Sequence, residues 1–144
     1  MSSPVSNISL RMWHPTFAAN EIISEMKLHA KFSNSVGEQR RTPTGTPLEG
    51  VYKETYCSFS LKNKTSNHLN KELLAECDHL DQHAGFLRSF LHTGGRLEFY
   101  ISIFLDGDRG FEINPSLIRR MTALELGFTV EMYRLSDQEA RYAT

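Results

Sequence analysis

The middle of the chain carries four side chains that could ligate a metal ion, namely Glu72, Glu76, His79 and His83. At about 100° per residue, a helix would place all four within about 60° of one another. Metalloprotease helices, however, carry a glutamate directly after the first histidine, and this chain has Leu80 there. We therefore favour a solvated helix face with Glu–His pairs worth about 0.3 kcal/mol each over a metal site, and we predict no metal and no other cofactor.

Two adjacent arginines, Arg40 and Arg41, stand close to Glu38 in a segment with almost no hydrophobic period. We expect this segment, Lys31–Gly50, to be a long loop, and loops of that length in small domains are often functional. The planar guanidinium fork suits carboxylate or phosphate recognition. The alternative, which we favour, is that the two arginines pair with acidic residues of the domain itself and anchor the loop over a sheet.

The other reactive side chains form no catalytic motif. The chain has no nucleophile elbow, and Gly94–Gly95 is not followed by the lysine and serine of a phosphate-binding loop. Cys57 and Cys77 fall on apolar stripes and are typical of small buried hydrophobic residues. His14, at the end of a predicted strand, has no evident partner. We expect no catalytic residue and no enzyme, with an active site assembled only in space as the alternative.

The composition is that of an ordinary globular protein, with 144 residues of which 40% are hydrophobic, 10% aromatic and 23% charged. Sixteen Lys and Arg against seventeen Asp and Glu give a net charge of −1, which disfavours a general binder of polyanions. No apolar run approaches the roughly 20 residues of a membrane span, and the N-terminus lacks a signal-peptide core. Two cysteines exclude a disulfide scaffold. We therefore expect a cytoplasmic protein.

Alternating apolar and polar residues predict strands in four places, and turn chemistry predicts a fifth short one. The four expected strands cover residues 8–13, 51–61, 96–105 and 128–135, and the short strand covers residues 111–113. Apolar side chains of the two clearest strands, Phe59, Ile101 and Ile103, are expected in the core. Val51 is expected on the same face as Phe59.

Helical periodicity predicts helices in three regions. The first runs over residues 20–28 with Asn20 as its N-cap, and the second over residues 69–91 with a break near Gly85. The third begins at Pro115 behind the N-cap Asn114 and ends at Gly127.

These elements predict one α+β domain over residues 1–144, with a core over 7–135 and a polar tail over 136–144. We expect a mixed or antiparallel sheet of four to five strands with helices mainly on one face. Ferredoxin-like βαβ halves joined by an inserted helical segment would account for a weak internal repeat. The strand order stays open.

The outward faces of the predicted strands are rich in aromatic residues, namely Trp13, Tyr52, Tyr56, Tyr100, Phe104 and Tyr133. Charged residues interleave with them, namely Arg11, Glu54, Arg96, Glu98 and Glu131. Large aromatic side chains with arginine are enriched at protein interfaces, and stacked bases are the other use of such a face. The alternative is that the helical segment 69–91, or a second copy of the chain, covers this face.

The loop Val36–Gly45, with the residues Gly-Glu-Gln-Arg-Arg-Thr-Pro-Thr-Gly, leads into Tyr52–Tyr56. This order, together with Phe111–Leu117 and Val130–Tyr133, resembles the bacterial family designated domain of unknown function 4279. The resemblance spans roughly residues 7–135. It implies a fold and a single-domain character, and it implies no activity.

We predict a non-enzymatic protein-binding module, most specifically an immunity or antitoxin-type protein that occludes a toxin. A single-stranded nucleic-acid binder or a small-ligand binder is the alternative. The expected partner is another protein or a second copy of the chain, with neither a membrane nor nucleic acid expected. The expected contact residues are Tyr52, Tyr56, Arg96, Tyr100, Phe104, Arg40 and Arg41.

Overall fold

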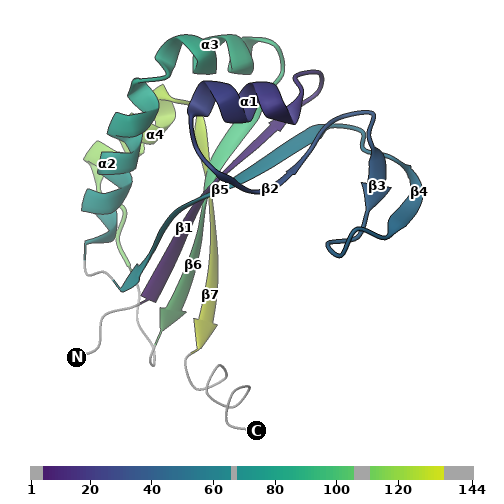
Figure 1. Ribbon diagram of the computed structural model, residues 1–144. Coiled ribbons are helices and arrows are strands. Elements are labelled where there is room, and N and C mark those ends of the chain that lie inside the picture. The colour runs from purple at the N-terminus through teal and green to yellow at the C-terminus, as the bar shows by residue number, and fades with distance from the viewer. Residues whose placement is uncertain (1–4, 66–67, 106–110, 135–144) are drawn as a thin grey trace, which may run out of the picture.

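The computed structural model describes residues 5–65, 68–105 and 111–134. It shows a five-stranded sheet, a layer of helices and a projecting two-stranded arm (Figure 1). The strands are β1 Val5–His14, β2 Ala30–Asn34, β3 Gln39–Arg41, β4 Pro47–Val51, β5 Thr55–Thr65, β6 Arg96–Leu105 and β7 Leu126–Arg134. The helices are α1 Ala19–Met26, α2 Leu69–Asp81, α3 Ala84–His92 and α4 Pro115–Ala123. None of the described helices is long and apolar enough to cross a membrane.

The main sheet has the strand order β2-β5-β1-β6-β7, and every neighbouring pair is antiparallel except β6 and β7. The predicted α+β class with a mixed sheet is confirmed. The expected arrangement of two separate βαβ halves is wrong. Strand β5 lies between β1 and β2, the two strands of the first βαβ unit, and β1 lies between β5 and β6, the two strands of the second. Two βαβ units therefore interleave, and the helices α2 and α3 form the crossover of the second unit rather than an insertion between two halves.

The core lies between the sheet and the helices. In the register of the sheet, Leu10 of β1 is opposite Phe59 on one side and Phe99 on the other, and none of the three is exposed. Helix side chains complete this core, namely Ile22, Met26, Leu73, Leu80, Leu87, Phe90, Leu117 and Met121. The predicted burial of Phe59, Ile101 and Ile103 is confirmed. All four helices cover the same face of the sheet (Figure 1).

The first turns of α4 and α1 are capped differently, one by a neighbouring residue and one by a residue distant in sequence. The Asn114 side chain accepts the backbone N–H of Leu117 at 2.9 Å, so the predicted cap of α4 is confirmed. The predicted cap at Asn20 is wrong. Helix α1 begins at Ala19, whose backbone N–H donates to Ser35 Oγ at 2.8 Å. The hydroxyl that serves this helix end therefore comes from a remote part of the chain.

The segment predicted as a long loop is mostly strand. It forms β2, at the edge of the main sheet, and the hairpin of β3 with β4 that makes the arm. Every residue of β3 and β4 is exposed, so no alternation of apolar and polar residues marks them. Val51, predicted to face the core, ends β4 with 54% exposure.

Two further expectations are corrected, and two lie outside the described residues. No strand forms at residues 111–113, and the break between α2 and α3 falls at Gln82 and His83, ahead of Gly85. The turn 106–110 and the polar tail 136–144 are outside the described residues. Gly94 follows α3 at φ +103°, and a side chain on Gly95 would lie 2.5 Å from the Phe90 ring, so both glycines are required there.

Candidate functional site

The face of the sheet opposite the helices carries the aromatic and charged residues noted in the sequence, and we call it the open face. Its members on the described strands are Arg11, Trp13, Tyr56, Arg96, Glu98, Tyr100, Phe104, Glu131 and Tyr133. No described helix packs on it (Figure 1). The alternative that the segment 69–91 covers this face is therefore wrong, because α2 and α3 lie on the other side of the sheet.

Arginines stack on two of the open-face rings. The guanidinium carbon of Arg11 lies 3.6 Å from the centroid of the Tyr100 ring, and that of Arg96 lies 4.1 Å from the Trp13 ring. The Trp13 and Tyr56 rings are 5.4 Å apart. Cross-strand neighbours bring these groups together, because Trp13 is opposite both Tyr56 and Arg96 in the sheet.

Carboxylates hold this arrangement in place. Glu98 pairs with Arg11 at 3.4 Å and accepts the Thr129 hydroxyl at 2.9 Å. Glu54, just before β5, pairs with Arg96 at 3.3 Å. Each stacked arginine is therefore oriented by a carboxylate as well as by a ring.

Hydrogen bonds at the far end of the face involve Glu131, which accepts the Tyr133 hydroxyl. Two hydrogen bonds lower the pKa of the Glu131 carboxyl. The bond from Tyr100 has the larger effect, and the bond from Tyr133 has the smaller one. The same bond to Glu131 raises the pKa of Tyr133 to about 12. Near neutral pH the carboxylate is ionised and the phenol is protonated.

Hydrogen bonds join the arm to the body at its base. Thr55 Oγ1 donates to the Phe17 carbonyl at 2.5 Å and accepts the Val36 backbone N–H at 2.9 Å. Two backbone hydrogen bonds of 2.9 Å lead from there into the arm. The Gly37 N–H donates to the Tyr52 carbonyl, and the Tyr52 N–H donates to the Glu38 carbonyl. The Tyr52 hydroxyl also binds both backbone groups of Arg41, at 3.2 and 3.3 Å.

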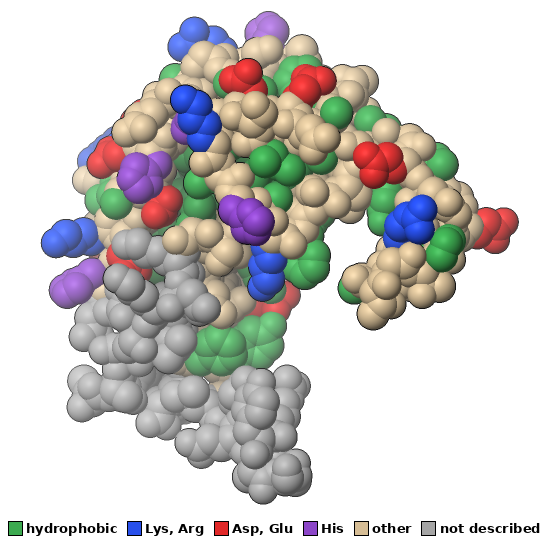
Figure 2. Space-filling model, viewed as in Figure 1, with side chains coloured by type: hydrophobic (Ala, Val, Ile, Leu, Met, Phe, Trp, Pro, Cys, Tyr) green, Lys and Arg blue, Asp and Glu red, His purple; other side chains and the backbone are tan. Residues whose placement is uncertain are grey.

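A hollow of about 620 Å³ lies between β2 and the arm. Figure 2 shows the arm standing away from the body with a recess beside it. Tyr52 and Tyr56 both line this hollow, together with Phe32, which is 54% exposed. Because Tyr56 also contacts Trp13, the hollow and the open face form one continuous surface.

The prediction that Arg40 and Arg41 pair with acidic residues of the domain and anchor their segment over the sheet is wrong. Arg40 donates to the Glu49 carbonyl at 3.3 Å, and Arg41 donates to the Gly45 carbonyl at 3.2 Å. Neither forms an ion pair with an acidic side chain in the described part of the chain. Both arginines are exposed on the arm, where their hydrogen bonds to backbone carbonyls stabilise its turns.

The structure thus separates the seven expected contact residues into two groups. Tyr56, Arg96, Tyr100 and Phe104 lie on the open face, where the Phe104 ring stacks on Tyr133 at 5.1 Å. The remaining three, Tyr52, Arg40 and Arg41, lie on the arm. Sequence reasoning missed Phe32 of β2, because an exposed edge strand carries no periodic signal.

His14 and the cysteines are structural. His14 is fully buried and is stacked on Phe17, with ring centroids 3.8 Å apart. Burial raises the pKa of the Cys57 thiol and of the Cys77 thiol to about 11. Thiols with such pKa values are protonated near neutral pH and are poor nucleophiles. The predicted burial of both cysteines is confirmed.

The Glu and His residues on one face of α2 differ in burial. Glu76 is 6% exposed, whereas the His79 side chain is 68% exposed and lies 3.4 Å from the Glu76 carboxylate. Among the residues that the structure describes, no group of three or more potential ligands could hold a metal ion. The absence of a metal stays a prediction.

Exhaustive chelation with EDTA is expected to leave the melting temperature unchanged. The physical reason is that the core is closed by apolar side chains and none of the described ligand groups converges. Thermal melting followed by circular dichroism checks this. A large drop that added zinc reverses would establish a structural metal.

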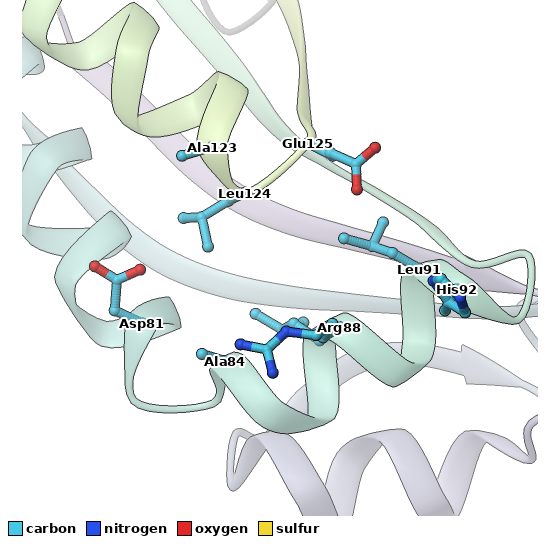
Figure 3. A pocket seen from close by; sticks show the side chains of 9 residues that line it. Asp81, Ala84, Arg88, Leu91, His92, Ala123, Leu124 and Glu125 are labelled. Atoms are coloured by element: carbon cyan, nitrogen blue, oxygen red, sulfur yellow. The ribbon is translucent and has the colours of Figure 1, made fainter.

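A second hollow, of about 510 Å³, lies between α3 and the end of α4 (Figure 3). Its apolar side chains include Leu91 and Leu124, but its charged groups Arg88 and Glu125 point in different directions (Figure 3). Asp81 is already bound by Arg120 at 2.7 Å. The polar groups of this hollow do not converge on one point.

Comparison with the curated proteins finds no match, and comparison with the solved structures finds none either. A family model described as Domain of unknown function (DUF4279) matches residues 4–135. The match covers almost the whole chain, and the resemblance seen in the loop Val36–Gly45 and in the closing helix and strand is confirmed. The chain belongs to the DUF4279 family.

Proposed function

We propose that this protein is a non-enzymatic protein-binding module that contacts its partner through the open face and the adjoining arm. The observation that carries the proposal is a helix-free sheet face on which arginines are stacked on aromatic rings and oriented by carboxylates. Tyrosine, tryptophan and arginine have apolar bodies and polar tips, so they tolerate water when free and burial when bound. The aromatic residues of this face are half-buried and no described helix covers them, and an uncovered apolar patch usually marks an interaction site.

The charge of the open face supports a protein partner over single-stranded nucleic acid. Its two arginines, Arg11 and Arg96, are matched by two glutamates, Glu98 and Glu131, and Glu54 at its edge pairs with Arg96, so the charged residues described on this face have no positive excess. A surface that binds phosphates by counterion release is cationic. In addition, guanidinium groups already lie over one face of the Tyr100 and Trp13 rings, which leaves less ring surface for bases to stack on.

An immunity-type role, in which the partner is a toxin, is the specific form of this proposal. It is supported by the small size of the chain, by the lack of a catalytic motif and by the mixed-charge aromatic surface. The test is to search the genes beside the one for this protein for a secreted toxin, to purify a toxin found there and to titrate it with this protein. Loss of toxin activity at equimolar ratio supports the role, and full activity at excess contradicts it.

Tyr100→Ala is expected to weaken partner binding by about 2 kcal/mol, which is the threshold of an interface hot spot. Tyr100 lies on β6 near the middle of the open face, and its loss removes both a ring and the stacking surface of Arg11. Isothermal titration calorimetry measures the binding, and chemical denaturation of the free protein measures stability. Stability is expected to change little, since the helices lie on the other face.

The matched control is Ile118→Ala, because Ile118 is 52% exposed on α4, in the helix layer. The control is expected to bind like the wild type. If Tyr100→Ala lowers stability while binding and oligomeric state stay unchanged, the open face is not the interface. Salt-dependent binding of the wild type to single-stranded oligonucleotides would instead favour the nucleic-acid alternative.

A further inference from the structure

A third hollow lies among the helices, on the covered side of the sheet. It has a volume of about 410 Å³, within the roughly 300–1,000 Å³ range of small-molecule sites. Apolar side chains line part of it, namely Met26, Leu28, Leu61 and Leu80. Polar side chains line the rest, namely Lys27, Glu76, His79, Gln82 and His83. We call it the Glu76 hollow.

Glu76 is the unusual residue of this hollow, because it is an acidic residue with a buried side chain. The residue is 6% exposed and lies on the buried stripe of α2 with Cys77 and Leu80. Within the described part of the chain its one polar contact is His79 Nδ1, at 3.4 Å. That contact is long, and it joins the buried Glu76 side chain to a largely exposed imidazole, so it compensates the acidic group only weakly. A cation in the hollow would compensate it better.

Lys27 brings a positive charge to the same hollow from a different element. It is the C-cap of α1 and has a left-handed backbone, with φ 55°, where glycine is the usual residue. Its side chain is exposed and has no ion pair in the parts of the chain that the structure describes. The hollow therefore offers one anion, one cation and an apolar wall.

We propose that the Glu76 hollow binds a small zwitterion of the amino-acid class with an apolar side chain. Glu76 takes the ammonium group, Lys27 takes the carboxylate, and Met26, Leu61 and Leu80 contact the apolar side chain. The competing explanation is that Glu76 and Lys27 serve stability alone, as an internal ion pair formed when the lysine side chain turns inward.

The test is calorimetric titration of the full chain with three matched probes. L-leucine carries both charges, 3-methylbutylamine lacks the carboxylate, and 4-methylpentanoate lacks the ammonium group. We expect leucine to bind most tightly and the amine about tenfold more weakly, a difference of about 1.4 kcal/mol. The acid is expected not to bind. Absence of leucine binding at millimolar concentration overturns the proposal.

Two variants assign the roles. Glu76→Gln is expected to abolish binding of both leucine and the amine, while Lys27→Met is expected to weaken leucine about tenfold and to leave the amine unchanged. The controls are Glu25→Gln on α1 and Lys71→Met on α2, since both residues are exposed and neither lines the hollow. Both controls are expected to bind leucine like the wild type.

Melting temperature separates a ligand site from a structural ion pair. Glu76→Gln replaces a largely buried acidic group, held by one long contact, with a neutral amide, so the free protein is expected to melt at the same temperature or higher. If Glu76→Gln and Lys27→Met both lower the melting temperature by the same amount, the pair is structural and the proposal is overturned. Because the hollow and the open face lie on opposite sides of the sheet, this result leaves the protein-binding proposal unaffected.

Discussion

Ile101→Ala is expected to lower the free energy of unfolding by about 2–5 kcal/mol, the range for truncating a buried aliphatic side chain. Ile101 is 0% exposed and lies on β6 between Ile8 of β1 and Val130 of β7. The substitution removes methyl groups from a site closed by three strands, which cannot collapse without disturbing the sheet. Urea denaturation followed by circular dichroism measures the loss.

Ile118→Ala is the control for this measurement, because it makes the same chemical change at a side chain that is 52% exposed on α4. It is expected to change stability by less than about 0.5 kcal/mol. An unfolding midpoint that is the same for Ile101→Ala and the wild type would contradict the register of β6 against β1.

His14→Leu is expected to cost several kcal/mol, because it leaves two backbone N–H groups without their acceptor at about 1–3 kcal/mol each. His14 Nδ1 accepts the N–H groups of Thr16 at 3.0 Å and Phe17 at 2.9 Å. Its Nε2 lies 2.8 Å from Thr93 Oγ1, which itself donates to the Ser89 carbonyl. These partners assign the proton to Nε2 and make the ring neutral. Leucine has a comparable bulk but replaces none of these bonds.

The same residue predicts a dependence of stability on pH. Burial, the largest cause, lowers the pKa of His14 in the folded protein, so the unfolded chain takes up a proton first as pH falls below about 6.5. The contribution of His14 to stability is therefore complete above pH 6.5. It is lost progressively as pH falls toward the lower pKa of the folded state. In His14→Leu this part of the pH dependence is expected to disappear.

Urea denaturation of both proteins between pH 7.5 and 5 measures the difference, and the other five histidines cancel because both proteins carry them. His92→Leu is the control, since His92 is exposed at the end of α3. It is expected to keep the stability and the pH dependence of the wild type. If the stability of the wild type and of His14→Leu depended equally on pH, the buried imidazole would accept a proton without loss of stability, which would contradict this prediction.

Local patterns were sufficient for the strands of the core and for one helix. Alternating residues around Phe59 and Ile101 predicted β5 and β6, because one face of each strand is buried and the other is not. The cap and the first residue of α4, Asn114 and Pro115, were predictable since the capping bond spans only three residues. The aromatic residues of the open face followed from the same alternation.

The arm was not predictable from local patterns. Its strands β3 and β4 are exposed at every position, so burial leaves no trace in their sequence. Their position depends on Thr55, which binds both Phe17 and Val36, and on Ser35, which binds Ala19. These partners are distant in sequence, so the chain meets them only once β5 has paired with β1.

The sequence alone determined the α+β class, the core strands and the aromatic and charged residues of the open face. Each of these follows from the spacing of hydrophobic residues along the chain. The tertiary structure decided the strand order, the arm, the partners of His14 and the burial of Glu76. Glu76 shows the physical reason. A carboxylate on a helix is exposed or buried according to what packs against that helix, here the end of α1 and β5, and such packing is set by contacts that no local pattern contains.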